Sequence, residues 1–305
     1  MSELASDINA NARNLDTVVI PVAGVGTRHL PATAGVPKFM LHVSEGDLSR
    51  PNIDYTLADC VGAGIKNIIF ITSGSGEQHL RTFLGPMDPD LQQQYRDLGK
   101  EKQLEDELAR RAVFNEINLM YVEQTAGKYG TAIPLMLARP ALAELGVKHF
   151  AVYGGDDFIW HRDGTSELEL MINTWRKAGT PHAIMGNPVS PDEASRYGIL
   201  RVGEDGNLVE IDEKPPRERV PANPLANISR YILEGEAIWP HLEKYLTSEL
   251  APGQKEYYIT DVINAVVADD HEATVHPARG VYLDAGSPRS LLRASIYLTD
   301  KVDQN

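Results

Sequence analysis

The sequence has little cysteine, little basic charge and no long apolar run. Its one cysteine, Cys60, excludes an intrachain disulfide and a cysteine-based metal cluster, and it suits a reducing compartment. With 29 basic against 43 acidic residues the net charge is −14, so the chain lacks the basic surface that binds nucleic acids or anionic membranes. No segment approaches the roughly 20 apolar residues that cross a bilayer. We therefore expect a cytoplasmic protein with no nucleic-acid partner and no membrane partner.

Short apolar segments alternate with helical patterns over the first 190 residues. Segments of this kind, with almost no charge, are typical of strands that are covered on both faces, as in parallel sheets. The alternation predicts an α/β fold of three layers, in which a Rossmann-like, mixed but mostly parallel sheet carries helices on both faces. The expected strands are 17–22, 67–72, 118–122, 149–153 and 182–185, and the expected helices are 52–64, 75–85, 88–112, 131–145 and 165–178.

The pattern changes after residue 195. Two short strands around an Asp205-Gly206 turn predict a β-hairpin over 198–211, and a further strand is expected over 226–233. Helices should follow near 234–246, near 259–269 and from Ser287. No linker rich in glycine, serine or proline interrupts the chain. We therefore expect an N-terminal extension over 1–16 and a single domain over 17–305.

A glycine loop follows the first expected strand. Gly24 and Gly26 let backbone N–H groups approach a phosphate chain, while Arg28 and Lys38 can add positive charge beside it. The segment 17–44 contains no Asp or Glu, although the chain as a whole is acidic. These features favour a polyphosphate site. Taken alone, a Gly-x-Gly turn after a strand could equally be an ordinary structural turn.

Two better-known nucleotide motifs do not fit this loop. A dinucleotide fingerprint requires a third glycine where His29 stands, and the acidic Glu45 and Asp47 are expected in a loop, not at the end of a second strand. A P-loop sequence is also missing. A nicotinamide-dependent oxidoreductase is therefore disfavoured.

Carboxylates are expected at the ends of two strands. Asp156 and Asp157 follow the strand predicted over 149–153, at the edge where α/β sheets bind ligands, and Asp284 ends another apolar run. Such carboxylates can hold Mg²⁺ together with phosphate oxygens. The alternative is that each aspartate caps a helix, and this is the better interpretation of Asp157. The nine histidines form no recognisable pair at ligand spacing, so we expect them to be structural or exposed.

The order of the motifs resembles that of the sugar-1-phosphate nucleotidyltransferases. The matching segments are Gly24-x-Gly-Thr-Arg-x-x-Pro-x-Thr33 and Pro37-Lys38, and the likeness extends from about residue 17 to 290. Within the family, the chain is most similar to the bacterial enzymes that use UTP and glucose 1-phosphate. The resemblance implies the nucleotide-diphospho-sugar transferase fold, a Mg²⁺ cofactor and a homodimer or homotetramer. It also implies a nucleotide-binding half over 17–160, a sugar-binding half over 161–290 and a C-terminal helix over 287–305.

The resemblance also implies roles for individual residues. The amide of Gln124 would match the imide edge of uracil, because it offers a donor and an acceptor side by side. The nucleotide contacts would be Ala23, Gly24, Gly26, Thr27, Gln124, Gly130 and Thr131; the sugar contacts Gly198, Glu213, Lys214 and Asn227; the catalytic cations Arg28, Lys38 and Lys214; and the metal ligands Asp156 and Asp284. Glu256 resembles part of a segment that flanks the sugar.

The expected reaction is attack by the sugar phosphate on the α-phosphorus of UTP, giving UDP-glucose and pyrophosphate. The chain departs from the family pattern at Ala34, Phe39, Arg50 and Ser229, where the family usually carries other residues. Two alternatives therefore remain open. The first is the same chemistry with dTTP, another nucleotide or another hexose 1-phosphate. The second is a non-catalytic paralogue that binds nucleotide-sugar and regulates a partner.

Overall fold

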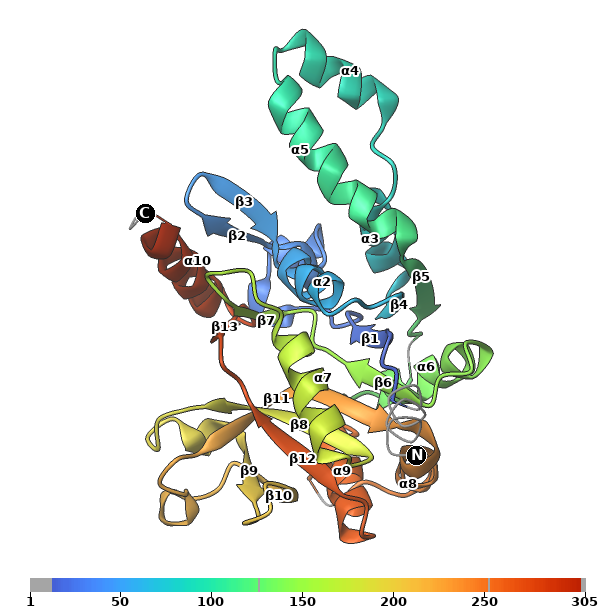
Figure 1. The fold of residues 1–305 in the computed structure, drawn as a ribbon, viewed down its shortest axis with the longest axis vertical. Helices are drawn as coiled ribbons and strands as arrows, with labels where there is room; N and C mark the ends of the chain where they lie inside the picture. Colours follow the sequence, from blue (N-terminus) through green and yellow to red (C-terminus); the bar gives the residue numbers. More distant parts are fainter. Residues whose placement is uncertain (1–12, 126, 252, 303–305) are drawn as a thin grey trace, which may run out of the picture.

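A nine-stranded mixed sheet forms the centre of the molecule in the structure, a computed structural model that describes residues 13–125, 127–251 and 253–302 (Figure 1). The expected extension over 1–16 lies mostly outside the described residues. The strands of the sheet are β1 (Thr17–Pro21), β4 (Asn67–Thr72), β5 (Asn118–Glu123), β6 (His149–Val152), β8 (His182–Pro188), β9 (Gly198–Val202), β10 (Leu208–Glu213), β11 (Leu225–Glu234) and β12 (Ala273–Pro277).

The topology divides the sheet into a parallel part and a mixed part. Strands β6, β1, β4 and β5 are parallel neighbours in that order, as the alternation of strands and helices predicts. Strand β11 then joins β6 in the antiparallel sense and also pairs with β8 and β9. The remaining pairs are β8 with β12 and β9 with β10. The carboxyl ends of β1 and β6 therefore lie at the same sheet edge, beside the middle of β11.

Helices cover both faces of this sheet. The helices that the structure describes are α2 (Asn52–Gly62), α3 (Gly74–Leu84), α4 (Pro89–Asp97), α5 (Glu101–Ala112), α6 (Ile133–Glu144), α7 (Glu167–Ala178), α8 (Gly235–Thr247), α9 (Ile259–Ala268) and α10 (Pro288–Val302), of which α4, α5 and α10 lie away from the sheet. Within the described ranges, none of these helices combines the length and apolar character that a membrane crossing needs.

The side chains of β1 show how the two faces are filled. Val18 and Ile20 pack in one apolar cluster with α2, α3 and α7, whereas Val19 packs in a second cluster with α6, α8 and α9. Successive side chains of a strand point to opposite faces, so an uninterrupted apolar strand requires helices on both sides. Cys60 is fully buried in the first cluster. The three-layer α/β prediction is confirmed.

Two small hairpins lie outside the main sheet. Strand β7 (Asp157–Trp160) pairs with β13 (Val281–Asp284), and β2 (His42–Glu45) pairs with β3 (Leu48–Pro51). The expectation that Glu45 and Asp47 lie in a loop is wrong for Glu45, which ends β2, while Asp47 lies in the turn that follows. This hairpin was not predicted because only Val43 in it is fully buried, so the sequence carries little apolar alternation.

The charged segment expected over 88–112 forms two helices, α4 and α5, which project from the body as an arm (Figure 1). They are separated at Gly99, whose φ of +66° is the left-handed conformation that favours glycine. Two arginines near the end of α5 attach the arm to the body. Arg110 donates to the carbonyl of Phe83 and pairs with Asp54, and Arg111 donates to the carbonyl of Gly85.

Candidate active site

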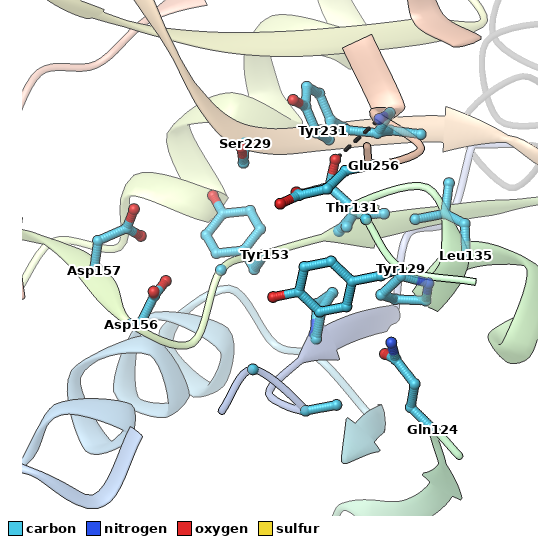
Figure 2. Close-up of a pocket in the computed structure, with 18 residues that line it drawn as sticks. Gln124, Tyr129, Thr131, Leu135, Tyr153, Asp156, Asp157, Ser229, Tyr231 and Glu256 are labelled. Carbon is cyan, nitrogen blue, oxygen red and sulfur yellow. Dashed lines mark hydrogen bonds between the residues drawn. The ribbon is translucent and has the colours of Figure 1, made fainter. Parts of the chain in front are cut away.

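Two adjoining pockets open at the carboxyl ends of β1 and β6. The first has a volume of about 260 Å³ and contains Gln124 (Figure 2), and the second has a volume of about 330 Å³ and contains Arg28 and Lys38. They share Pro21, Gly24, Tyr129, Thr131 and Asp156 in their walls. The sheet edge at which the sequence predicts ligand binding therefore carries a continuous depression.

The glycine loop forms one wall of the second pocket. Gly26 has a φ of +65°, and a Cβ atom at this position would lie 2.9 Å from the Cγ2 of Thr33. The hydroxyl of Thr33 donates to the carbonyl of Gly26 at 2.9 Å, which fixes the turn. The buried ring of His29 contacts the carbonyl of Ala285 at 3.0 Å through Nε2. His29, which takes the place of a third glycine, thus joins the loop to the segment that follows β13.

Two cations and two carboxylates converge beyond this loop. Lys38 forms an ion pair with Asp156, and a Cβ atom on Gly286 would lie 3.6 Å from both the Lys38 Nζ and an Arg28 nitrogen. Asp284 accepts a hydrogen bond from the Gly286 N–H at 2.7 Å. The N–H of the residue after Asp284 donates to the carbonyl of Asp156 at 3.3 Å. Four residues predicted from separate motifs are therefore brought together.

Asp157 differs from its neighbour and corrects the sequence interpretation. It begins β7 instead of capping a helix, and it forms a buried ion pair with Arg230 at 2.8 Å. Its other carboxylate oxygen accepts from the hydroxyl of Tyr282 at 2.7 Å. Burial raises the pKa of Asp157, and the nearby Arg230 guanidinium opposes that shift. Asp156, by contrast, has a side chain that is 46% exposed, so it is the more accessible of these two carboxylates.

The glycine segment around Gly130 forms the far wall of the first pocket. A Cβ atom on Gly130 would lie 2.3 Å from the carbonyl oxygen of Tyr257, so no larger residue fits. Tyr257 donates its N–H to Tyr129 and accepts from the Ala132 N–H, both at 2.9 Å. The Thr131 hydroxyl accepts from the N–H of Ile259 at 3.0 Å (Figure 2). These bonds place the neighbouring Glu256 in the pocket wall.

Gln124 lies at the other side of the first pocket. It directly follows β5, and its N–H donates to the carbonyl of Thr72 at 2.8 Å, which extends the pairing of β4 with β5. Ala23 and Gly24 line the pocket from the glycine loop, and Tyr129 lies near Gln124 (Figure 2). The predicted nucleotide residues Ala23, Gly24, Gln124, Gly130 and Thr131 all line this pocket, and Gly24, Gly26, Thr27 and Thr131 line the second one.

The predicted sugar residues of the hairpin lie together but outside both pocket walls. Glu213 faces Gly198 across the β9–β10 pair, and a Cβ atom on Gly198 would lie 2.8 Å from a Glu213 carboxylate oxygen. Lys214 has a φ of +46°, and its Nζ lies 3.4 Å from Glu213. Both side chains are more than half exposed. The hairpin therefore presents an exposed Glu-Lys pair beside the pockets.

Asn227 connects the strand β11 to the first pocket. Its amide donates to the Tyr231 hydroxyl at 2.9 Å, and Tyr231 lines the pocket. Between them, Ser229 also lines the pocket, with a left-handed φ of +55° at the bulge in β11. Sequence reasoning assigned no site role to Tyr129, Ser229 or Tyr231. The spacing of Ser229 and Tyr231 from Asn227 along a strand was the available signal for the last two.

Comparison with known proteins identifies the family of this chain. The chain matches the model of the nucleotidyl transferase family over residues 17–301 and belongs to that family. It is 32% identical to the UTP–glucose-1-phosphate uridylyltransferase of Haemophilus ducreyi over 92% of this chain and 91% of the relative.

Solved structures of similar proteins have the same fold. A UTP-bound UDP-glucose pyrophosphorylase from Acinetobacter baumannii superposes with a TM-score of 0.77 at 25% identity, over 95% of this chain and 98% of that one. A UDP-glucose pyrophosphorylase complexed with UDP-glucose gives a TM-score of 0.76 at 26% identity, over 94% of this chain and 100% of the other.

Proposed function

We propose that this chain is a UTP:glucose-1-phosphate uridylyltransferase. A phosphate oxygen of glucose 1-phosphate attacks the α-phosphorus of UTP in line, the bond from that phosphorus to the β-phosphate oxygen breaks, and pyrophosphate leaves. The observation that carries this proposal is the convergence of Arg28, Lys38, Asp156 and Asp284 beside a pocket that contains Gln124. The relatives named above support the choice of substrates.

In our proposal each nucleotide residue has a distinct role. Ala23, Gly24, Gly26 and Thr27 bring backbone N–H groups to the phosphates, and Arg28 neutralises charge on the departing pyrophosphate. Lys38 lies near the reacting phosphorus. Gln124 pairs with uracil, while Gly130 and Thr131 support the opposite wall of the nucleoside pocket. No protein nucleophile is required, because positioning and charge neutralisation are the main contributions of a protein to such a transfer.

The carboxylates of Asp156 and Asp284 fit a magnesium ion. Mg²⁺ takes oxygen ligands and is commonly held by one or two carboxylates together with substrate phosphates. Asp156, which is nearly half exposed and lines the second pocket, and Asp284, which ends β13, are donors of this kind. When bound, the ion supplies charge neutralisation on the phosphate oxygens. In the protein itself, Lys38 balances the charge of Asp156 and the Gly286 N–H orients Asp284.

The sugar phosphate would be held from the second half of the chain. In our proposal residues 17–160 bind the nucleotide and residues 161–290 bind the sugar, with Lys214 on the sugar phosphate. Glu213 accepts hydrogen bonds from sugar hydroxyls, and Asn227 accepts or donates them. Gly198 leaves the space that Glu213 occupies. We further propose that the enzyme acts in the cytoplasm as a homodimer or homotetramer.

A second candidate function is the same chemistry with another nucleotide or another hexose 1-phosphate. Ser229 and Tyr231 place two hydroxyl-bearing side chains in the wall of the first pocket, and these could favour a different hexose 1-phosphate or base. The regulatory, non-catalytic alternative is disfavoured by the retained Arg28, Lys38 and Asp156.

Pyrophosphate release by the purified protein with Mg²⁺ tests the proposal. UTP, dTTP, GTP, CTP and ATP are each combined with several hexose 1-phosphates. We expect turnover to be highest with UTP and glucose 1-phosphate. A maximum at another pair would keep the mechanism and change the substrate. Binding of UDP-glucose without turnover of any pair would instead identify a regulatory paralogue.

A further inference from the structure

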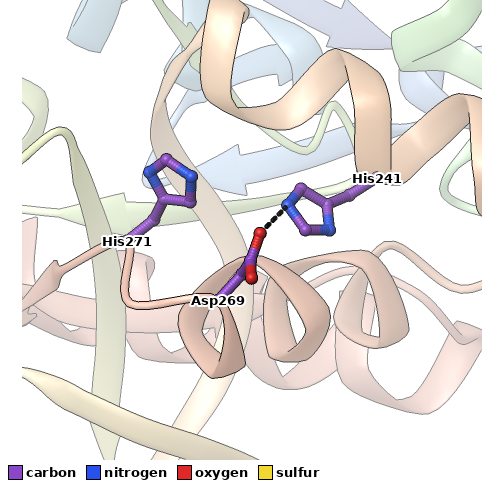
Figure 3. Close-up of side chains that lie close together, drawn as sticks. All are labelled: His241, Asp269 and His271. Atoms are coloured by element: carbon purple, nitrogen blue, oxygen red, sulfur yellow. Dashed lines mark ion pairs between the residues drawn. The ribbon is translucent and has the colours of Figure 1, made fainter.

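Two histidines and an aspartate lie close together outside the active-site pockets. His241 is on α8, Asp269 directly follows α9, and His271 lies in the short loop before β12. The carboxylate of Asp269 points between the two imidazole rings (Figure 3). None of these three residues lines either of the pockets described above. His241 and His271 are 30 residues apart in the sequence, so no spacing pattern along the chain predicts that they meet.

The geometry of the three side chains suits a small cation. Each offers one ligand atom, and these atoms all lie within 4.8 Å of one another. The Nε2 of His241 is 3.5 Å from a carboxylate oxygen of Asp269. Two ligands of a tetrahedral ion with bonds of about 2.0–2.1 Å lie roughly 3.3 Å apart, so this pair is already near the required separation.

The local fold holds the three residues in place. Asp270 has a left-handed φ of +61°, which is uncommon for a residue other than glycine, and it turns the chain between Asp269 and His271. The N–H groups of Asp270 and His271 both donate to carbonyls in the last turn of α9, at 3.2 Å. The ring of His271 also packs near the buried ring of His182, with 6.3 Å between centroids. His271 is thus kept beside the end of α9.

We propose that His241, Asp269 and His271 form a binding site for a divalent transition metal, best suited to Zn²⁺. Two imidazoles and one carboxylate are typical zinc ligands, whereas Mg²⁺ and Ca²⁺ prefer all-oxygen sets. Three protein ligands leave a fourth position for water. The open hollow beside His271 is also lined by Asp205, Asp270 and Glu272, whose negative charges attract a cation.

A bound ion would join α8 to the end of α9. The segment between these helices contains Glu256, which lines the first pocket, and Tyr257, whose backbone pairs with Tyr129 and Ala132 on either side of Gly130. The site would therefore fix the base of a segment that forms the nucleotide wall. It does not depend on the proposed activity, because its residues touch neither pocket.

Zinc titration of the full-length protein tests this site. After treatment with a chelator, the wild type, His271→Ala and Asp269→Asn are titrated with Zn²⁺ by calorimetry. Asp269→Asn keeps the shape of a largely exposed side chain, so it should fold normally. The control is His79→Ala, because His79 is a partly exposed histidine whose Nδ1 contacts the carbonyl of Ser75 in its own helix.

We expect one equivalent of zinc to bind the wild type and His79→Ala, and affinity to fall at least about 10-fold in His271→Ala and Asp269→Asn. Zinc should also raise the Tm of the wild type and not that of the two site variants. Equal affinity in the wild type and both site variants would overturn the proposal. A loss of zinc binding in Asp156→Asn without a loss in His271→Ala would also overturn it, because the ion would then occupy the catalytic carboxylates.

Discussion

Lys38 and Lys214, the two lysines assigned to substrate phosphates, are held in opposite ways. The Lys38 side chain is 12% exposed and pairs with Asp156, which follows a central strand, whereas Lys214 directly follows β10 and its side chain is 65% exposed. The nucleotide side of the site is fixed by the parallel sheet, and the sugar side by antiparallel strands added to it. Under the proposed function, charge placement is rigid where the phosphorus would react and adjustable where the sugar would enter.

Removing the charge of Asp156 should have the largest effect. In Asp156→Asn we expect kcat to fall about 10²–10³-fold, because a fixed charge at the reacting phosphate is lost and Lys38 loses its partner. The measurement is steady-state pyrophosphate release at saturating substrates. Asp163→Asn, in an exposed loop, serves as the matched control. A loss below about tenfold in Asp156→Asn would contradict a rigid catalytic role for the nucleotide side.

Glu167 supports the segment that leads into β13 and Asp284, and its substitution tests how much this support contributes to stability. Its fully buried carboxylate accepts from His276 at 2.8 Å, from His161 at 2.7 Å and from the N–H groups of Arg279 and Gly280, just before β13 and Asp284. Although burial acts in the opposite direction, these hydrogen bonds lower the pKa of Glu167 to about 2 from its ordinary 4.5. The carboxylate therefore stabilises the fold fully above about pH 4.5, and this contribution is lost as pH falls toward 2.

We expect Glu167→Gln to lower the free energy of unfolding at pH 7 by about 3 kcal/mol, since one pKa unit corresponds to about 1.4 kcal/mol. The difference from the wild type should shrink as pH falls from 4.5 toward 2. Urea unfolding at pH 7 and at pH 3 measures both effects. Glu169→Gln, on the exposed face of the same helix, should change stability little at either pH. If the free energies of unfolding of the wild type and Glu167→Gln differ by the same amount at both pH values, this account is refuted.

Substitution of Lys214 should impair the reaction less than substitution of Asp156, as expected for an exposed residue on the sugar side. We expect Lys214→Ala to raise the KM for glucose 1-phosphate about 10-fold, which corresponds to the loss of one hydrogen bond to a charged group, and to leave the KM for UTP unchanged. Lys214→Arg should recover part of the loss. Initial rates with each substrate varied in turn separate the two constants. An equal rise in both KM values would remove the distinction between the two sides.

Substitution of Ser229 should give the smallest effect of these variants, and it should raise stability instead of lowering it. Its φ of +55° is costly for any residue with a Cβ atom, so Ser229→Gly should stabilise the protein by up to about 1 kcal/mol. Thermal unfolding measures this change. Because Ser229 lines the first pocket, the ratio of kcat/KM values for different hexose 1-phosphates should change as well. A destabilised Ser229→Gly would show that the hydroxyl contributes more to the fold than the backbone conformation costs.

The sequence predicts the nucleotide side better than the sugar side for a physical reason. Parallel strands end at the same sheet edge, so the residues after 17–21 and 149–152 had to meet there once the alternation was recognised. Asp157 shows the limit of this reasoning. Its partner Arg230 lies on β11, 73 residues away, and no local pattern reveals that the two side chains pair in the core.

The hairpin of the sugar side illustrates a different limit. Its strands and turn were predicted from local sequence, but its place relative to the pockets depends on long-range contacts, which include the pairing of β9 with β11 and the hydrogen bonds of Asn264 to the backbone of Ile211. The His241–Asp269–His271 cluster was missed for the same reason, because its members come from three elements and have no motif spacing. Long-range contacts of this kind are decided by packing, which one sequence does not display.

The arm formed by α4 and α5 offers a practical site for protein engineering. Its tip at Leu98 and Gly99 is exposed and projects away from the body (Figure 1), while its base is secured by Arg110 and Arg111. Exposed turns of this kind accept inserted sequence with little loss of stability. A peptide tag or fluorophore inserted after Gly99 would therefore label the molecule far from its substrates and report on association between copies without obstructing turnover.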